Sequence, residues 1–411
     1  MTSVSQNPAP SPSFTVTRLM SLDVLRGFDM FWILGADAAV LALGALLDNP
    51  LGHALGSQVE HKVWAGFACY DLIFPLFVFI SGVSLVFALP RKLAQVGRAA
   101  TIRSILARAL ILFALGVLYN GGLSHAWPDV RLAGVLQRIA IAYAVTGVLF
   151  CLCRPRTSYI VGGVLLAGYW ALLTFVPVRD IALTREGIPA LVGTAQPDVA
   201  QVRQLYDSTQ TMVTGRYERG LNVANHFDYE YLPGAMYQVY WDPEGFLSTL
   251  PAIATCILGT MAGERLRRAD RTSRQKIAWL ATAGTVCVAA GWTWHLQFPV
   301  VKDIWTSSFV LVAGGYSFWL LAAFYYIVDV RQWRGWCQPF LWIGLNSITL
   351  YLATALVNFR EIAEKFGGGS LARWLDARCA GLGELTLALL TLGLIVALAG
   401  FLHRRKIYLR V

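Results

Sequence analysis

The side chains best suited to chemistry lie beside or within apolar segments. Asp71 opens a long apolar run, His61 precedes it by ten residues, and Asp37 lies deep in the previous apolar segment. Ionisable groups are costly in lipid and usually mark a functional site there. An imidazole changes its charge near neutral pH, so it can act as a general base or a nucleophile. These three residues are therefore the first candidates for an active site.

Other polar residues interrupt apolar segments. At 1.5 Å per helical residue, Asp37 lies roughly 20 Å beyond Asp23, which places it deep in the first span. One polar site near the outer face of a membrane would explain the group. The alternative is structural: Asp37 and Arg138 form an ion pair, and the amides bridge helices. The further members of the group are Gln137, Asn120, Lys302 and, near mid-depth, Asn346.

The composition indicates a polytopic membrane protein. Hydrophobic residues make up 56% of the 411 residues and charged residues 14%, which excludes an ordinary soluble domain. Most apolar runs approach the roughly 20 residues that cross a bilayer core. We therefore expect an all-α protein with about ten transmembrane helices. The expected spans are 22–47, 72–89, 105–119, 132–152, 159–176, 246–261, 277–294, 305–328, 340–357 and 385–402.

The net charge of +10 follows from the topology. If the N-terminus is cytoplasmic, 21 of the 34 Lys and Arg lie inside, and five of the other 13 fall in one long outer loop. Ten spans also return the C-terminus to the cytoplasm. Nucleic-acid binding is therefore not expected. Asp23 and Arg26, three residues apart near the cytoplasmic face, are expected to pair with each other.

Three segments are expected to lie outside the bilayer. Residues 1–19 form a disordered tail without the apolar core of a signal peptide, and the transmembrane domain covers 20–411. Residues 177–245 form a periplasmic loop rich in Tyr, Asp and Glu, which suits a sugar but also fits a partly ordered cap. Residues 359–383, with three consecutive glycines, form a flexible outer loop. The seven cysteines include no CxxC pair, so we expect no metal site.

Seven stretches resemble the heparan-alpha-glucosaminide N-acetyltransferase family, including bacterial relatives associated with N-acetylglucosamine use. The resemblance begins with Ser21-Leu22-Asp23-Val24-Leu25-Arg26-Gly27 and spans nearly the whole chain in family order. The more specific part consists of the stretch 61–66, which begins with His61, the apolar run 71–82 and Asp242-Pro243-Glu244-Gly245. The other stretches are 134–138, 302–307 and 344–347.

The resemblance implies a transmembrane acetyltransferase of the bacterial inner membrane. Acetyl-CoA would enter from the cytoplasm and a glucosamine-type amino sugar from outside. His61 matches the catalytic histidine of the lysosomal enzyme, and Asp37 stands where that enzyme has an asparagine. His61 would act as a base or carry the acetyl group, with Asp37 orienting or stabilising its ring. A homodimer embedded in membrane lipids is also implied.

The remaining site residues are assigned by chemistry. Arg138 or Asn346 would stabilise a tetrahedral oxyanion. The other substrate-binding candidates are Asp71, Gln137, Asn120, Glu244 and Lys302. Arginines at the cytoplasmic face would bind the CoA phosphates, and Arg26, Arg103 and Arg108 are available there. Two rival functions stay open: a transporter of amino sugars, although no internal repeat supports it, and an O-acyltransferase of envelope glycans.

Overall fold

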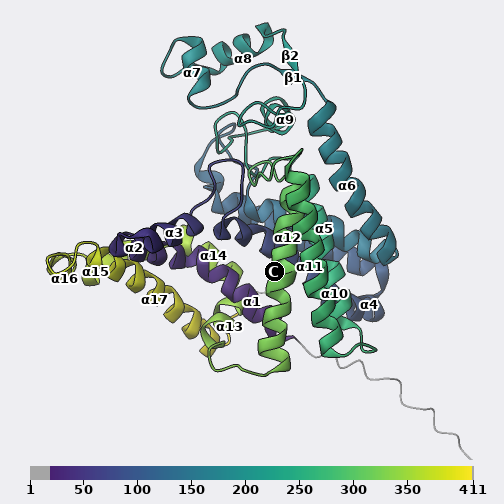
Figure 1. The fold of residues 1–411 in the computed structure, drawn as a ribbon, viewed down its shortest axis with the longest axis vertical. Coiled ribbons are helices and arrows are strands. Elements are labelled where there is room, and N and C mark those ends of the chain that lie inside the picture. The colour runs from purple at the N-terminus through teal and green to yellow at the C-terminus, as the bar shows by residue number, and fades with distance from the viewer. Residues whose placement is uncertain (1–18, 410–411) are drawn as a thin grey trace, which may run out of the picture.

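The chain folds into a bundle of long apolar helices with a small folded segment at one end, and almost no sheet (Figure 1). The computed structural model describes residues 19–409, so the expected N-terminal tail lies almost entirely outside the described residues. The helices of the first half are α1 Met20–Phe31, α2 Asp37–Leu47, α3 Pro50–Val59, α4 Ile73–Tyr119, α5 Val135–Leu152 and α6 Pro155–Phe175. Short η segments precede α2, α4 and α5: η1 Trp32–Ala36, η2 Cys69–Leu72 and η3 Gly122–Ser124.

The second half continues the bundle. Its long helices are α10 Thr249–Arg267, α11 Ser273–His295, α12 Ser307–Phe324 with its extension η4 Tyr325–Val330, and α17 Leu382–Arg404. Shorter helices lie between α12 and α17: α13 Gln338–Leu345, α14 Ser347–Leu356, α15 Phe359–Gly367 and α16 Ser370–Asp376. The expected flexible loop 359–383 is therefore largely helical, because α15 and α16 pack against α17.

Every expected span coincides with helix. By length and composition, the described residues hold 7 helices able to cross a membrane, or up to 8 if the bent pair α13 and α14 counts as one span. The protein is thus a multi-pass membrane protein, while the count of ten stays a prediction. Two differences explain the smaller number: α10 is not among these apolar helices, and one helical segment, Cys69–Tyr119, covers two expected spans.

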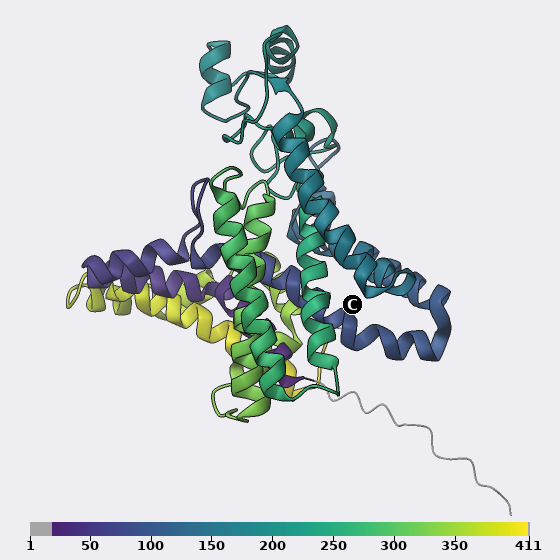
Figure 2. The ribbon, with the colours of Figure 1, turned by 45° about the vertical axis from the view of Figure 1, so that its right-hand side comes forward.

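Helix α4 is two helices joined at a break. Gly97 has φ 76°, which interrupts the helix, and Pro90 lies shortly before it. The Lys92 ammonium donates a hydrogen bond to the Ser104 hydroxyl, twelve residues further on. A straight helix would separate these residues by about 18 Å. The chain therefore folds back at Gly97, and the turn projects from the body of the molecule (Figure 2).

Facing glycines let the helices approach closely, as in other membrane bundles. A Cβ on Gly82 of α4 would lie 2.0 Å from the Cys256 carbonyl oxygen of α10, and one on Gly259 would lie 2.0 Å from the Phe79 oxygen. Helices α4 and α10 thus touch backbone to backbone, and α4 also packs along α5. These contacts fix the helices that carry the polar residues described below.

The segment 177–245 lies beyond the end of α6, outside the helix bundle (Figure 1). It contains the antiparallel pair β1 Val178–Arg179 and β2 Met212–Val213, and helices α7 Gly187–Val192, α8 Val199–Ser208 and α9 Val223–Tyr231. It has its own apolar cluster, which includes the fully buried Leu183 and Ile188 together with Trp241. The segment is therefore an ordered unit and not a loose loop.

Candidate active site

His61 lies in the connection between α3 and η2, where three other side chains meet it. Its Nδ1 lies 2.8 Å from Asp71 Oδ1, and the Lys302 Nζ lies 2.9 Å from each ring nitrogen. The Lys302 Nζ is also 3.8 Å from Asp71 Oδ1. The Tyr70 ring centroid is 4.7 Å from the imidazole centroid. The structure thus brings together three residues expected at the site from distant parts of the sequence.

Asp71 is the carboxylate that holds the imidazole. Its side chain is 1% exposed, whereas that of His61 is 48% exposed. The Ala68 amide donates to Asp71 Oδ2 at 2.9 Å, which fixes the carboxylate in the turn η2. Because Asp71 accepts a hydrogen bond from the Nδ1–H group, the neutral tautomer with Nε2 free of hydrogen is favoured. Nε2 is therefore the ring nitrogen that can accept a proton, and the Lys302 Nζ lies 2.9 Å from it.

Asp37 reaches the imidazole indirectly. It begins α2, directly after η1, where Gly35 with φ 118° breaks the first span. The Tyr70 hydroxyl donates to Asp37 Oδ2 at 2.7 Å. Asp37 therefore supports the ring of Tyr70, which in turn packs against His61. The expected direct contact between Asp37 and His61 is replaced by this two-step arrangement, and Asp37 does not pair with Arg138 in the described structure.

Lys302 is half-buried, beside charges of both signs. Burial lowers the pKa of Lys302, while Asp71, Asp303 and Glu244 act in the opposite direction. The amine therefore loses its proton more easily than an exposed lysine. Its electrostatic interaction with Glu244 and Arg138 also shows that a second polar cluster lies close to His61.

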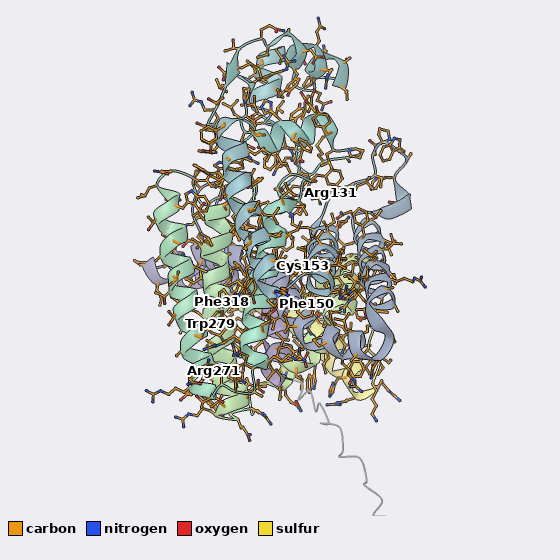
Figure 3. The ribbon with its side chains drawn as sticks, turned by 90° about the vertical axis from the view of Figure 1, so that its right-hand side faces the viewer. Arg131, Phe150, Cys153, Arg271, Trp279 and Phe318 are labelled. Carbon is orange, nitrogen blue, oxygen red and sulfur yellow. The ribbon has the colours of Figure 1, made fainter. Side chains whose placement is uncertain are left out.

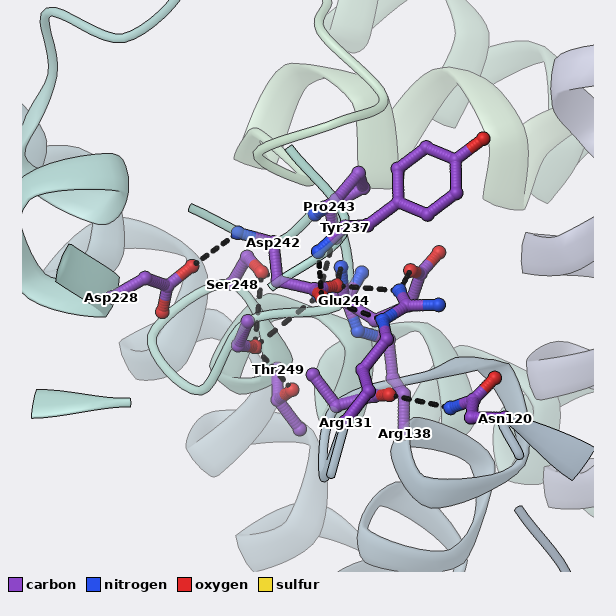
Figure 4. A network of polar contacts seen from close by, with 12 residues as sticks. Asn120, Arg131, Arg138, Asp228, Tyr237, Asp242, Pro243, Glu244, Ser248 and Thr249 are labelled. Atoms are coloured by element: carbon purple, nitrogen blue, oxygen red, sulfur yellow. Dashed lines mark hydrogen bonds and ion pairs between the residues drawn. The ribbon is translucent and has the colours of Figure 1, made fainter. Parts of the chain in front are cut away.

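The second cluster centres on the turn Asp242-Pro243-Glu244-Gly245 (Figure 4). Arg131 donates to Asp242 through Nε and Nη2, both at 2.8 Å, and to Glu244 at 2.7 Å. Burial would raise the pKa of Asp242, but Arg131 outweighs it and holds the pKa below its usual range. Burial and the Asp242 charge raise the pKa of Glu244. The turn thus keeps one firmly ionised carboxylate beside one that takes up a proton more easily.

Arg138 anchors the same turn from inside the bundle. Its Nη2 donates to the Pro243 carbonyl at 2.8 Å and also contacts the Ser248 hydroxyl. Its guanidinium lies 4.8 Å from the ring centroid of Trp305, three residues after Lys302. Two of its nitrogens, Nε and Nη1, are buried and have no partner among the described residues. Arg138 therefore connects the outer segment to the bundle, and two of its N–H groups could still donate hydrogen bonds to a ligand.

The expected amide residues have mainly local contacts. Asn120 donates to the Ala133 carbonyl at 2.9 Å, and a Cβ on Gly134 would lie 2.7 Å from both Asn120 Nδ2 and Gln137 Oε1. Asn120 and Gln137 thus shape the start of α5. Asn346 occupies the 76° bend between α13 and α14, where its Nδ2 donates to Trp342. Within residues 19–409, no hydrogen bond or ion pair joins Asn346 to His61.

The three arginines expected to bind the donor lie apart from one another. Arg26 contacts Asp23 at 3.2 Å, as expected, and also the Ser84 hydroxyl. Arg108 lies over the ring of Tyr143 at 5.0 Å from its centroid. Arg103 lies on an exposed face of α4. None of the three lines the large cavity that the structure contains.

That cavity has a volume of about 1060 Å³ and lies at the C-terminal end of α10. Figure 3 shows Phe150, Cys153 and Trp279 of its wall far below Arg131. Along α4, its residue Val86 lies about 22 Å from Asp71. Its basic lining residues are Arg265, Arg267, Arg268 and Lys276. The cavity and His61 thus mark two separate ends of the bundle.

Sequence reasoning missed four contributors: Tyr70, Arg131, Asp242 and the basic end of α10. Tyr70 directly precedes Asp71, and Asp242 belongs to a stretch already singled out, so both carried a local signal. Arg131 had none, because its partners are more than one hundred residues away. In the described residues, His61 is the one that pairs with a buried carboxylate among the histidines expected on the periplasmic side, which are His53, His61, His125, His226 and His295.

Comparison with known proteins places the site in context. Residues 18–185, which carry His61, Asp71 and Arg138, match the family model described as heparan-alpha-glucosaminide N-acetyltransferase, catalytic. The chain is 27% identical to the human heparan-alpha-glucosaminide N-acetyltransferase over 96% of its own length, and 28% identical to the mouse protein of the same name over 82%.

The chain is similar to the heparan-alpha-glucosaminide N-acetyltransferase family. It spans 60% of the human relative and 53% of the mouse relative, so these proteins are considerably longer. The matched region 18–185 ends before the turn 242–245 and Lys302. The family relation therefore covers His61, Asp71 and Asp37 most directly, and the structure adds the residues that lie around them.

Proposed function

We propose that this protein is a transmembrane N-acetyltransferase. It transfers the acetyl group of cytoplasmic acetyl-CoA to the amine of a glucosamine-type sugar on the periplasmic side of a bacterial inner membrane. The observation that carries the proposal is the contact of His61 with the buried Asp71, beside the Lys302 ammonium. The similarity to the heparan-alpha-glucosaminide N-acetyltransferase family supports the reaction type and the acceptor class.

The reaction needs a base, because a sugar amine is largely protonated at neutral pH and attacks only when neutral. His61 Nε2 takes the proton, and Asp71 at Nδ1 stabilises the resulting imidazolium. The neutral amine nitrogen bonds to the thioester carbonyl carbon and releases its second proton to solvent, the carbon–sulfur bond breaks, and the imidazolium gives its proton to the departing thiolate. In the two-step variant, Nε2 itself first receives the acetyl group and then passes it to the amine.

Lys302 is suited to the oxyanion of this reaction. Its Nζ lies 2.9 Å from His61 Nε2, so a carbonyl carbon attacked beside Nε2 places its oxygen within reach of the ammonium. Arg138, with two unpartnered nitrogens, lies close enough to add to the positive field. Lys302 therefore takes the oxyanion role that the sequence alone assigned to Arg138 or Asn346.

The acceptor is expected to bind between His61 and the turn 242–245. Glu244 has an acceptor oxygen beyond its contact with Arg131, and Tyr237 lies over the Arg131 guanidinium at 5.1 Å with 59% of its surface exposed. An exposed ring beside a carboxylate suits a pyranose, whose apolar face stacks while its hydroxyls and amine bind polar groups. The small ordered segment 177–245 would form the outer wall of this site.

The donor is expected to bind in the large cavity. A volume of about 1060 Å³ accommodates a large ligand. Its four basic residues would bind the phosphates of CoA, and Trp279, which stacks on Arg265 at 5.6 Å, offers a surface for adenine. This assignment replaces Arg26, Arg103 and Arg108 as the phosphate ligands.

Turnover by the purified protein tests the proposal. Acetyl-CoA hydrolysis or transfer that depends on glucosamine is expected, and a transporter would show none. N-acetylglucosamine, whose amine is blocked, should not serve as an acceptor; efficient acetylation of it would indicate an O-acyltransferase. Sealed right-side-out vesicles loaded with acetyl-CoA should acetylate external glucosamine. Acetylation of trapped glucosamine alone would overturn the proposed orientation.

A further inference from the structure

Five exposed arginines gather at two turns of the bundle. Arg91, Arg98 and Arg103 flank the break of α4 at Gly97, and Arg154 and Arg156 form the turn between α5 and α6. We name these five residues the arginine patch. Within residues 19–409, none of their guanidinium groups has an ion pair or a side-chain hydrogen bond. The patch is therefore a concentration of uncompensated positive charge.

The surrounding sequence supplies no carboxylate to compensate it. Between Asp71 and Asp180, the chain contains a single acidic residue, Asp129. Some exposed arginines elsewhere are paired: Arg203 with Asp207 at 3.0 Å and Arg216 with Glu218 at 3.4 Å. Others, such as Arg274 and Arg373, have no ion pair or side-chain hydrogen bond with the described residues. The patch is therefore distinguished by the number of arginines gathered at its two turns.

Contacts between the two turns hold the patch together. The hydrogen bond from Lys92 to Ser104 closes the fold of α4, so that Arg91 and Arg103 flank the same turn. Arg98 lies close enough to Cys151, near the end of α5, to interact with it electrostatically. Arg154 follows Cys151 by three residues. The turns of α4 and of α5–α6 therefore present their charge side by side.

An apolar groove leads away from the patch along α4. It is a widely open depression of about 610 Å³ on one face of α4, formed by Ala99, Ile102, Arg103, Leu106, Ala107 and Leu110. Leu106 and Leu110 are 50% and 70% exposed, as expected for side chains that face lipid. The alanines leave space between them, and Arg103 is the charged member of the six. The Arg103 guanidinium thus lies beside an apolar groove that suits a hydrocarbon chain.

We propose that the arginine patch and this groove form a binding site for an anionic phospholipid. The phosphate binds the guanidinium groups of Arg98 and Arg103, and one acyl chain lies along Leu106 and Leu110. Arginine binds phosphate through paired N–H donors, which suits this headgroup. A water-soluble anion would leave the groove unused, and a zwitterionic lipid would bring its own cation against the patch. The inference is independent of the proposed enzymatic function.

Native mass spectrometry of the purified protein, titrated with phosphatidylglycerol, tests the site. Each arginine near an anionic lipid contributes about fivefold to binding, so Arg98→Gln with Arg103→Gln should weaken it about 25-fold. The matched control, Arg203→Gln with Arg216→Gln, removes the same charge outside the bundle and should leave the affinity unchanged. Ala107→Trp fills the groove without changing charge and should also weaken binding. Added salt should weaken the lipid interaction of the unmodified protein.

Several outcomes would overturn the site. Equal binding of phosphatidylcholine with the same acyl chains would show that the charge of the headgroup does not contribute to binding. If glycerophosphate competed as effectively as the lipid, the acyl chain and the groove would not contribute to binding. Loss of CoA affinity in the Arg98→Gln and Arg103→Gln variant, with lipid binding unchanged, would assign the patch to the acetyl donor. Unchanged lipid affinity in both the patch and the Ala107→Trp variants would reject the site outright.

Discussion

At the scale of single residues, the central observation is that Asp71 and Asp37 differ in how they contact His61. Asp71 is buried and touches the ring, whereas Asp37 acts through the Tyr70 hydroxyl. The distinction assigns different tasks to the two residues. Asp71 selects the tautomer and stabilises positive charge on the imidazole, while Asp37 and Tyr70 hold the ring in position.

His61→Ala should abolish acetyl transfer, with a loss of roughly 10²–10⁴-fold or more, because the imidazole is assigned to the proton transfer or to the acyl intermediate. Donor binding should persist, since the large cavity is about 22 Å away along α4. Transfer kinetics and CoA binding by calorimetry measure the two effects. Near-normal turnover would remove His61 from both roles and direct attention to His125 and His295.

Asp71→Asn and Asp37→Asn should separate the two carboxylates. The first replaces the acceptor at Nδ1 and should lower the rate roughly 10²–10⁴-fold, as for the equivalent group in Ser-His-Asp triads. The second keeps an oxygen that accepts from Tyr70, so substantial activity should remain. Tyr70→Phe should lower kcat more than it changes KM.

Tyr217→Phe is the matched control for this set, because it also removes one hydroxyl hydrogen bond, of 2.8 Å, in the outer segment. A rate for Asp37→Asn as low as that for Asp71→Asn would show that Asp37 acts by its charge and not by its hydrogen bond.

At the scale of elements, the turn 242–245 connects the outer segment with the bundle. Arg131 and Arg138 bind it from the membrane side, and Asp228 of α9 accepts the Phe246 amide from the other side at 3.2 Å. A Cβ on Gly245 would lie 1.8 Å from Asp228 Oδ2. The turn therefore depends on a glycine for the close approach of α9.

Gly245→Ala should destabilise the protein, because the added methyl group displaces Asp228 from the turn. Overpacking of this kind costs roughly 1–3 kcal/mol. Gly168→Ala in α6 is the control, since its Cβ would meet no atom within 4 Å. Thermal unfolding in detergent should show a lower midpoint for the first variant and not for the second. Equal midpoints would show that the turn tolerates the side chain.

Asp228 should make the outer segment sensitive to pH. Burial raises its pKa to about 7, well above the value of an unfolded chain. The folded state then binds more protons than the unfolded state between about pH 4 and 7, so this group's contribution to stability falls as the pH rises through that window. Above pH 7 its effect is constant.

Asp228→Asn should remove that contribution. The unfolding midpoint of the variant, relative to that of the parent protein, should therefore rise between pH 5 and 8. The comparison is needed because His226, whose pKa burial lowers to about 4, has the opposite effect on acidification. A difference that is independent of pH would show that Asp228 stays ionised.

At the scale of the whole molecule, the helices separate two functional ends. His61, Lys302 and the turn 242–245 lie at the end that carries the outer segment, and the basic cavity lies at the other. The proposed transfer across a membrane requires such a separation, because the donor and the acceptor would enter from opposite sides.

Cysteine labelling tests the topology. In a protein with the exposed Cys69 and Cys379 replaced by serine, an impermeant maleimide added to intact cells should label Ala195→Cys in the outer segment but not Arg271→Cys after α10. Permeabilised cells should label both. Labelling of Arg271→Cys from outside would reject the ten-span arrangement, in which the basic turn of α4 at Gly97 and the basic turn after α10 both lie in the cytoplasm.

The sequence by itself determined the class and the positions of the helices, because apolar length is a local property of the chain. It also proposed His61, because ionisable groups are costly in lipid. The pairing of Asp23 with Arg26, three residues apart, is local for the same reason. The family relation could also be inferred from motifs alone.

Only the tertiary structure decided which side chains meet. Lys302 reaches His61 from 241 residues away, and Arg131 reaches Asp242 from 111 residues away. Such contacts depend on helix packing and on breaks at Gly35 and Gly97, which hydropathy does not reveal. The cavity at the end of α10 likewise forms between helices distant in sequence. Spacing along the chain therefore proposed His61, but packing decided its partners.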